Sequence, residues 1–345
     1  MNYPKVSIIL LNWNGWKYTV DCLESLLKAE AVDFEVVLVD NGSTDDSIKM
    51  IEEWIVSHGI PESRFSLPAA QKLAGNGDGF GGRKGMRRII LFSLPENLGF
   101  CAGNNLGLKQ AQVNDIPYAL ILNNDTLVDP NFLSPIVEYA DAHPEAGLIE
   151  GQIRYADDPG KIWHMGDQFS WQLGSRNIYF NRSTREAPAE PFFTGWISGC
   201  MALMPLSVFS KIGGYDEKLF LFCEDWDLSL RAIKFGYKLA VVPSSIIYHK
   251  VSKTLGKTSP FVYYYSGRNL FLLWNRYLPK WRAYLLSAAY LPYKFFKAVF
   301  FTIKYKKPYY IFFTELVFDA AFGRYGKWRR HDKIAADMKK KRYGN

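Results

Sequence analysis

Carboxylates and amides follow several short apolar runs of this chain, at positions where they could contact a ligand. They are Asn12 and Asn14 after residues 6–11, Asp40 after residues 34–39, and Asn123-Asn124-Asp125 after residues 118–122. A carboxylate at a strand end can hold a divalent cation, which in turn neutralises a diphosphate. We therefore take Asp125 as the candidate metal ligand. Asp40 is an acceptor-only side chain that can take hydrogen bonds from a nucleobase N–H or from ribose hydroxyls.

A second acidic cluster, Glu224-Asp225-Trp226-Asp227, precedes the helical pattern of residues 228–236. Acids in the first turn of a helix interact favourably with the helix dipole, so a structural role is one interpretation, and for Asp227 that role is an N-cap. Crowding among carboxylates raises the pKa of one of them, which suits a general base. We assign the role of the base to Asp225.

His249 ends another apolar run, residues 246–249. A neutral imidazole at a strand end can be a metal ligand, whereas a lone histidine more often has a structural role. Spacing alone does not separate these two interpretations, and both stay open.

The apolar runs alternate with helical patterns along the first part of the chain. Strands are predicted at residues 6–11, 34–39, 88–92 and 118–122, and helices at residues 16–29, 44–57 and 102–111. Short, β-rich apolar runs that alternate with helices are typical of a doubly wound α/β domain with a mostly parallel sheet. Ligands bind such sheets at the carboxyl ends of the strands, which is where the polar groups described above fall.

Two helix starts carry capping signals. Ser43, Thr44 and Asp45 offer N-cap oxygens after the second predicted strand. Asp129-Pro130 is predicted to open a later helix, because proline is tolerated in a first helical turn.

Residues 59–87 interrupt the alternation and include a Gly-rich segment, residues 75–85, with six glycines. This segment lacks GxxxxGK[ST] and does not lead from a strand into a helix, so it is not predicted to bind phosphate. We interpret residues 59–87 as a flexible insertion, with a mobile lid as the alternative.

The net charge of +8 is unevenly distributed over the 345 residues. Residues 261–345 hold 18 Lys and Arg against 4 Asp and Glu, whereas residues 1–260 hold 24 against 30. We therefore expect a catalytic α/β domain over residues 1–260 and a separate basic region over residues 261–345. The four cysteines contain no CxxC pair, which argues against a zinc ribbon or a disulfide framework. A short apolar N-terminus without a cleavage site predicts a protein on the cytoplasmic side.

The basic region is also aromatic, since residues 261–330 hold 24 of the 55 Phe, Tyr and Trp residues. Its longest charge-free stretch, residues 283–293, has 11 residues and is too short to span a membrane. Aromatic residues with many cations suit amphipathic helices in the headgroup region of an anionic leaflet, so we predict peripheral binding to the cytoplasmic face of the cell membrane. The alternative is a helical subdomain that packs on the catalytic domain or on a partner subunit. A nucleic-acid partner is not expected, because no reading motif is present.

Six motifs in order make the chain resemble glycosyltransferase family 2, particularly its rhamnosyltransferase-like members. They are VSIILLNWNG, VLVDNGSTDDS, ENLGFCAGNNLGL, ALILNNDTLVDP, SGCMALMPLSVFSKIGGYDEKLFLFCEDWDLSLRA and VVPSSIIYHK, within about residues 4–255. The resemblance implies a GT-A fold, a Rossmann-like, mostly parallel sheet flanked by helices, here followed by the basic aromatic helical region. It also implies a nucleotide-diphospho-sugar donor, a divalent metal (Mg²⁺ or Mn²⁺) and inversion at the anomeric carbon.

The resemblance also implies roles for individual residues. Asn123-Asn124-Asp125 matches the DxD element of the family, with Asn123 in place of the usual first aspartate. Asp125 is at the metal-ligand position, and Asn124 is on the ribose side. Asp40 matches the nucleobase-contacting acid, and Asp225 matches the catalytic base beside Glu224. The remaining matches are Asn12 in the first nucleotide loop, Asn97 and Asn104 along the nucleotide and sugar, and His249 at a position that ligates metal in some members. We also predict that Asn14 and Asp227 bind the nucleotide or the substrate and that Glu224 belongs to the catalytic pair.

The leading hypothesis is an inverting glycosyltransferase that moves a sugar, rhamnose or another hexose, from a nucleotide donor to a hydroxyl of a growing, lipid-linked glycan. A sugar nucleotidyltransferase is an alternative, but we find no Gly-rich signature with a reactive lysine near the first strand. A dehydrogenase is disfavoured because no GxGxxG follows that strand. A non-catalytic sugar-nucleotide-binding scaffold at the membrane is a third hypothesis, because asparagines such as Asn123 stand where the family has acids. The donor sugar, the acceptor and a homo-oligomeric state stay open.

Overall fold

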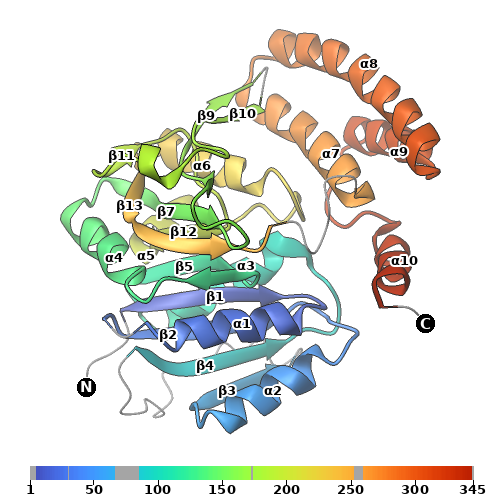
Figure 1. The fold of residues 1–345 in the computed structure, drawn as a ribbon. Coiled ribbons are helices and arrows are strands. Elements are labelled where there is room, and N and C mark those ends of the chain that lie inside the picture. The colour runs from blue at the N-terminus through green and yellow to red at the C-terminus, as the bar shows by residue number, and fades with distance from the viewer. Residues whose placement is uncertain (1–4, 30, 67–84, 172–173, 252–258, 344–345) are drawn as a thin grey trace. The chain divides into compact units, whose positions relative to one another are not determined.

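The computed structural model describes residues 5–29, 31–66, 85–171, 174–251 and 259–343, which divide into two compact units. The first unit comprises Met1–Tyr215 and Leu228–Val251, and the second comprises Asp216–Asp227 and Ser252–Asn345. Figure 1 shows strands and helices that alternate along the first unit, and helices that make up the end of the chain.

The first unit is built on one large sheet. Its strands are β1 (Val6–Asn12), β2 (Phe34–Asp40), β3 (Glu62–Ser66), β4 (Met86–Ser93), β5 (Tyr118–Asn123), β6 (Thr126–Val128), β7 (Ala146–Tyr155), β8 (Ile162–His164), β11 (Phe192–Phe193), β12 (Met201–Pro205) and β13 (Lys238–His249). The order is β11-β13-β7-β12-β5-β1-β2-β4-β3, while β6 pairs with β13 and β8 pairs with β7. The pairs along β5-β1-β2-β4-β3 are parallel, and β12 is antiparallel to β5 and β7. The strands β9 (Asp167–Ser170) and β10 (Gly174–Asn177) form a separate antiparallel pair.

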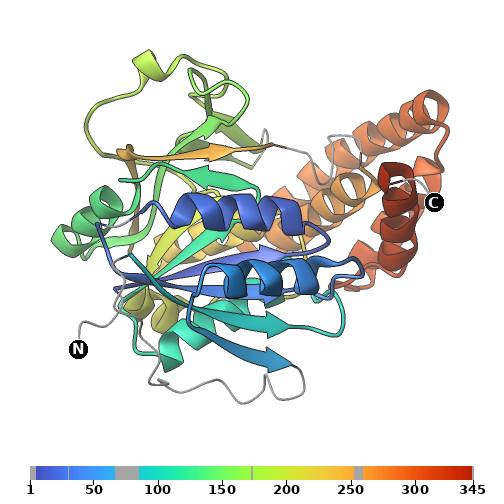
Figure 2. The same ribbon diagram turned by 60° about the horizontal axis from the view of Figure 1, so that its bottom comes forward.

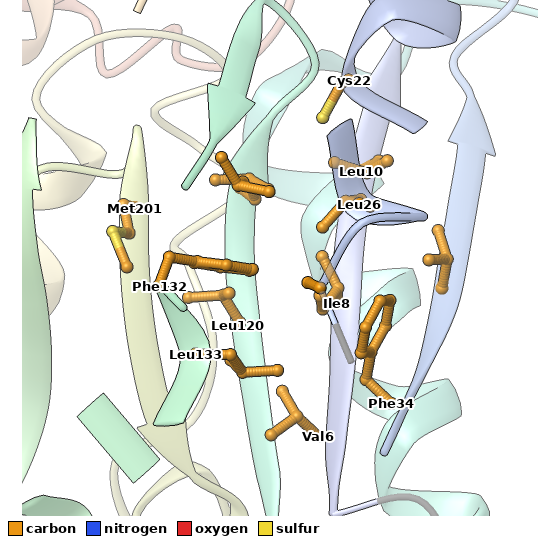
Figure 3. Close-up of a cluster of buried hydrophobic side chains, with 14 of the residues drawn as sticks. Val6, Ile8, Leu10, Cys22, Leu26, Phe34, Leu120, Phe132, Leu133 and Met201 are labelled. Carbon is orange, nitrogen blue, oxygen red and sulfur yellow. The ribbon is translucent and has the colours of Figure 1, made fainter. Parts of the chain in front are cut away.

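Helices cover one face of this sheet and bury a large apolar core. They are α1 (Trp16–Leu26), α2 (Ser47–Ser57) and α4 (Leu133–Ala142). The alternate residues Val6, Ile8 and Leu10 of β1 point into this core, beside Leu26 of α1 and Leu133 of α4 (Figure 3). Side chains at alternate positions of a strand share one face of the sheet, so β1 contributes every second residue to this core.

Helices α3 (Gly99–Val113) and α5 (Leu206–Ile212) pack together, and α3 also packs closely on β1. A Cβ atom on Gly103 would lie 2.3 Å from Leu11, and one on Gly107 would lie 2.5 Å from Ile9. These glycines therefore let the helix backbone approach the strand. Figure 2, turned by 60° from the first view, shows α1 and α2 lying along the strands of the sheet.

The structure corrects four local predictions and leaves one outside its range. Helix α2 begins at Ser47 with Asp46 at the N-cap position, so the N-cap is none of Ser43, Thr44 and Asp45. Asp227 lies inside the first turn of the helix Glu224–Lys234 and not at its N-cap. Residues 62–66 form β3, which pairs in parallel with β4, so this part of the predicted insertion belongs to the sheet. Helix α4 begins at Leu133 and not at Pro130, because Asp129 forms a turn whose side chain accepts the N–H of Asn131. The predicted insertion also includes residues 67–84, which lie outside the described residues.

The second unit is helical. Its helices are α7 (Pro260–Tyr277), α8 (Lys280–Tyr305), α9 (Tyr309–Ala321) and α10 (His331–Tyr343), and α6 (Glu224–Lys234) begins in this unit and continues into the first. Aromatic rings fill its interior, where Tyr264 stacks on Trp328 with ring centroids 4.1 Å apart. Within the described ranges, no helix combines the length and apolar character that crossing a membrane requires.

Candidate functional site

A hydrogen-bonded network joins the ends of β1 and β2. These strands are parallel and in register, so Asn12 lies opposite Asp40. The Asn12 amide donates to Asp40 Oδ1 (2.6 Å), and Ser43 donates to the same oxygen through its hydroxyl (2.6 Å). The backbone N–H of Ser43 donates to Asp40 Oδ2 (3.0 Å). Burial raises the pKa of Asp40, and the hydrogen bonds from Ser43 and Asn12 oppose that rise.

The neighbouring loops are tied to this network by further amide side chains. The backbone N–H of Asn14 donates to Ser43 Oγ (2.8 Å), and Asn14 Oδ1 accepts the N–H of Thr44 (2.8 Å). Asn97 accepts the N–H of Gly99 at the start of α3 (2.8 Å). Asn104, one turn further along α3, donates to the carbonyl of Phe100 (2.9 Å). Asn14 and Asn97 therefore fix the loops that follow β1, β2 and β4, whereas Asn104 bonds within α3.

Asn124 is joined to the same network by a residue that sequence reasoning missed. Thr19 on α1 donates its hydroxyl to Asn12 Oδ1 (2.9 Å) and accepts the amide of Asn124 (2.8 Å). Asn12 therefore has contacts with both the second strand and the turn after β5. The sequence pattern did not predict this role, because a threonine in the first turn of a helix is common and has no distinguishing motif.

Asp125 and His249 are brought together by strand pairing, although 124 positions separate them in the chain. The antiparallel pairing of β6 with β13 sets Thr126 opposite His249. His249 Nε2 lies 3.2 Å from Asp125 Oδ1, and both side chains are largely buried. The backbone carbonyl of Asp125 also accepts the N–H of Lys250 (2.9 Å). The turn at Asp125 is therefore held through its backbone carbonyl as well as through the Asp125 side chain.

The donor set of this pair fits a divalent metal. A carboxylate oxygen and an imidazole nitrogen at this separation can occupy neighbouring positions around one cation. His249 Nδ1 is buried and has no hydrogen-bond partner among the described residues. Among those same residues, no group of three or more His, Cys, Asp or Glu side chains is placed to hold a metal ion. Asp125 and His249 would supply two protein ligands, and substrate oxygens and water would take the remaining positions, as Mg²⁺ commonly requires.

A buried acidic residue on β7 was not predicted. Glu150 on β7 accepts the N–H of Gly166 (2.5 Å) and the N–H of Ser198 (2.9 Å), and His164 Nε2 lies 3.1 Å from its carboxylate. Trp163, next to His164, contacts the His249 ring edge-on, with centroids 4.4 Å apart. The signal available in the sequence was a lone acid inside an apolar strand, because a buried carboxylate requires partners.

In the second unit, a strained loop leads into the acidic cluster. Phe220, Phe222 and Cys223 have positive φ angles of 63°, 68° and 68°, which non-glycine residues rarely adopt. Asn269 on α7 donates its amide to three carbonyls of this loop, those of Leu219 (2.8 Å), Leu221 (3.0 Å) and Phe222 (2.8 Å). Strain of this kind costs about 1–3 kcal/mol per residue and persists where surrounding contacts enforce it, often at functional sites.

The three carboxylates after this loop have different surroundings. Burial, followed by repulsion from Asp225, raises the pKa of Glu224 well above its usual range. Asp227 is fully buried and accepts hydrogen bonds from Arg276 (2.5 Å) and from the hydroxyl of Tyr277 (2.8 Å). Both partners of Asp227 belong to α7, so this carboxylate joins the first turn of α6 to α7.

The described contacts thus gather the candidate residues into three groups. Asn12 and Asp40 end β1 and β2, the loops after β1, β4 and β5 hold Asn14, Asn97 and Asn124, and α3 holds Asn104. Asp125 pairs with His249. Glu224, Asp225 and Asp227 begin α6 in the second unit. The first two groups can bind a polar ligand and a cation, and the third contains Glu224, whose pKa burial raises, beside a second carboxylate.

Comparison with solved structures identifies the class of fold. A mannosyltransferase from Pyrobaculum calidifontis, solved with GDP-Man and Mn²⁺, aligns over 94% of this chain and 87% of its own, with a TM-score of 0.52 and 16% identity. GalNAc-T7, solved with UDP, GalNAc and Mn²⁺, aligns over 71% of this chain and 43% of its own, again with a TM-score of 0.52 and 16% identity. The first unit therefore has the GT-A fold of nucleotide-sugar-dependent glycosyltransferases, as the sequence predicted.

Family comparisons extend this conclusion from the fold to the family. The model described as glycosyl transferase family group 2 matches residues 118–322, and that of glycosyl transferase family 2 matches residues 7–64. The chain belongs to glycosyltransferase family 2. It is also 26% identical over 277 residues to the N-acetylglucosaminyl-diphospho-decaprenol L-rhamnosyltransferase of Mycobacterium tuberculosis, covering 76% of this chain and 81% of that protein. A poly-beta-1,6-N-acetyl-D-glucosamine synthase of Staphylococcus epidermidis is 23% identical over 251 residues, 73% of this chain and 51% of its own length.

Proposed function

We propose that this glycosyltransferase inverts the anomeric centre of a sugar as it moves the sugar from a nucleotide-diphospho donor to a hydroxyl of a growing glycan. The observation that carries the proposal is the acid pair Glu224-Asp225, set after a strained loop that Asn269 holds in place. Because burial raises the pKa of Glu224 above its usual range, we assign the role of the base to the neighbouring Asp225. A single displacement with inversion needs one such base and no covalent enzyme intermediate.

The reaction follows from the chemistry of the acceptor. An acceptor hydroxyl becomes an effective nucleophile when Asp225 removes its proton as the new bond to the anomeric carbon forms. The bond between that carbon and the diphosphate breaks in the same step, and its electron pair leaves with the diphosphate. Asp125 and His249 would hold a divalent cation, which supplies positive charge to the departing diphosphate.

The network at the ends of β1 and β2 is the proposed nucleotide site. We propose that Asp40 accepts hydrogen bonds from the base or ribose and that Asn12 positions that carboxylate, because the Asn12 amide already donates to Asp40 and Ser43. Asn14, Asn97 and Asn104 belong to the surrounding loops and α3. Asn124 is proposed for the ribose side. For Asp227 we propose a positioning role, because its contacts to Arg276 and Tyr277 already occupy the carboxylate.

The donor and the acceptor are proposed by analogy with the mycobacterial relative. Its name specifies a rhamnosyltransferase that acts on a lipid-diphospho-linked sugar. We propose a deoxyhexose or hexose donor and a lipid-linked acceptor for this chain. Such an acceptor would bring the reaction to a membrane surface, which supports the expected peripheral location at the cytoplasmic leaflet.

The test is a panel of UDP-, GDP- and dTDP-sugars, each with Mg²⁺, Mn²⁺ or EDTA, in which donor affinity and slow release of the nucleoside diphosphate are measured. We expect one donor to bind in a metal-dependent way. Asp125→Asn should remove most of the metal dependence, and Asp225→Asn should abolish transfer but leave donor affinity nearly unchanged.

The outcomes separate the remaining hypotheses. Unchanged turnover in Asp225→Asn would exclude this residue as the base. Donor binding without turnover across a broad acceptor panel would favour the scaffold hypothesis. Release of pyrophosphate from a nucleoside triphosphate would favour a nucleotidyltransferase.

A further inference from the structure

Helix α8 exposes large apolar side chains along its whole length. Ile303 is 75% exposed, Phe296 69% and Trp281 65%. At 3.6 residues per turn these three residues fall within about 60° of one another around the helix. The other members of this surface, which we call the outer face of α8, are Tyr284, Leu285, Tyr293, Phe295, Val299 and Phe300.

The opposite side of α8 packs inside the second unit. Ala283, Lys294 and Ala298 are its buried residues. The ammonium of Lys294 donates to the carbonyl of Tyr263 on α7 (3.1 Å) and lies 4.4 Å from the centroid of the Tyr263 ring. One side of α8 is therefore fixed by packing, whereas its most apolar side is the one left exposed. A contiguous set of nine exposed large apolar side chains on one helix is the kind of surface that marks an interaction site.

The charges of α8 identify what this surface binds. The helix has no Asp or Glu over its 26 residues. Arg282, Lys297 and Lys304 fall roughly 100–160° around the helix from Trp281, so cations line one border of the outer face. Lys306 and Lys307 extend the positive charge just beyond the helix. This border is complementary to an anionic surface.

We propose that the outer face of α8 docks on an anionic lipid bilayer, with the helix lying in the plane of the headgroups. An in-plane helix buries its apolar side at the boundary of headgroups and acyl chains while its cations contact lipid phosphates. Trp and Tyr side chains, such as Trp281 and Tyr284, are suited to this boundary because each has an apolar ring and a polar tip.

A second copy of the chain is a poorer occupant for the same surface. Pairing of α8 with α8 about a two-fold axis would bring the same patch of both subunits together. Neither helix has an acid to pair with the cations of the other, so an aligned dimer would place like charges close to each other. A lipid surface supplies the missing negative charge.

Vesicle co-sedimentation of the full chain tests the proposal directly. Vesicles of phosphatidylcholine alone and of phosphatidylcholine with phosphatidylglycerol are compared at low and high salt. We expect binding to the anionic vesicles that is at least about tenfold tighter than to neutral ones and that weakens with salt. The fluorescence of Trp281, obtained by difference from Trp281→Phe, should shift to shorter wavelength on binding.

Two variants separate the apolar and the electrostatic contributions. Trp281→Ser/Phe296→Ser/Ile303→Ser should weaken vesicle binding by at least about tenfold, because three exposed apolar side chains are lost. Lys297→Gln/Lys304→Gln should reduce the preference for anionic vesicles. If the triple variant does not fold, Ile303→Ser alone should still weaken binding measurably.

The matched control removes three exposed apolar side chains from the first unit, in Val56→Ser/Ile233→Ser/Phe235→Ser. Equal losses in this control and in the α8 triple variant would overturn the proposal. The proposal would also be overturned if the wild-type chain did not sediment with anionic vesicles. The same holds if the chain formed a concentration-dependent dimer that the α8 triple variant abolished. The docking surface gives the proposed lipid-linked reaction its location, but these vesicles contain no donor or acceptor. Failure to dock and failure to bind a donor are therefore separate results.

Discussion

The contact between Asp227 and Arg276 allows a decisive test of what Asp227 does. Asp227 was predicted beside the substrate, yet its carboxylate is fully buried and accepts hydrogen bonds from Arg276 and Tyr277. If these contacts account for the residue, Asp227→Asn should lower the free energy of unfolding and leave donor affinity nearly unchanged. The converse pattern is expected of a substrate ligand.

The contacts set the magnitude of this effect. A hydrogen bond to a charged group contributes about 1.5–3 kcal/mol. Arg276 is 30% exposed and also pairs with Asp216, so we take the lower end, a loss of about 1.5–2 kcal/mol for Asp227→Asn. Arg276→Met leaves a buried carboxylate without its cation and should cost about 3 kcal/mol or more. The double variant should cost less than the two single losses together, by about 1.5 kcal/mol.

Urea unfolding followed by far-ultraviolet circular dichroism measures all four proteins of this cycle, and calorimetric titration measures their donor affinity. The control is Glu53→Gln, which removes an exposed pair with Lys49 and should change the unfolding free energy by about 0.5 kcal/mol or less. Additive losses, or a large fall in donor affinity with unchanged stability, would refute a positioning role for Asp227.

Three further predictions concern buried charges. The pKa of Glu224 is raised in the native state, so the native state binds more protons than the unfolded state and loses stability as the pH rises. Glu224→Gln removes this loss and should therefore stabilise the protein more at about pH 8 than at about pH 5. Measuring the free energy of unfolding at both pH values checks this. Burial lowers the pKa of Lys294 to about 7, so above that pH the unfolded state binds more protons than the native state. The stability of the native state should therefore rise between about pH 7 and pH 10, and Lys294→Met should stabilise the protein most near pH 6. Equal stabilisation by Lys294→Met at about pH 6 and about pH 10 would contradict this prediction. Glu35 on β2 is fully buried and pairs with Arg88 (2.8 Å), so Glu35→Ala should cost about 3–5 kcal/mol in urea unfolding. Glu35→Leu/Arg88→Met should recover only part of that loss, because Ser7 and Asn114 also donate to Glu35 and lose their acceptor.

Local pattern was sufficient for the elements with a strong apolar period. The strand predicted at residues 34–39 is β2 (Phe34–Asp40), and the helix predicted at residues 102–111 lies within α3 (Gly99–Val113). The start of α4 was misplaced because both the side chain and the carbonyl of Asp129 form local hydrogen bonds that favour a turn. The strand β3 was missed because its residues, ESRFS, show no apolar run. Pairing with β4 makes this segment a strand, and single-sequence propensity does not contain that pairing.

The candidate nucleotide loops were predictable for a simple reason. Parallel strands that begin in register also end in register, so polar residues directly after β1 and β2 meet at one edge of the sheet. Asn12 and Asp40 follow this rule and form a hydrogen bond of 2.6 Å. Thr19 and Ser43 were not predicted as members, because a hydroxyl side chain in a loop or an early helical turn reads as a cap or a core residue.

The pairing of Asp125 with His249 depends on long-range topology, which explains why the sequence left the role of His249 open. β13 lies beside β7 in parallel, and β6 then adds to β13 in the antiparallel sense. A shift of one residue in the β6–β13 register would turn the side chains of one strand to the other face of the sheet. The observed register instead sets His249 opposite Thr126, next to Asp125, with the two side chains 3.2 Å apart. Because the two proposed ligands come from segments that meet only in the folded sheet, the proposed metal site should form with the native sheet and be lost when β13 unfolds.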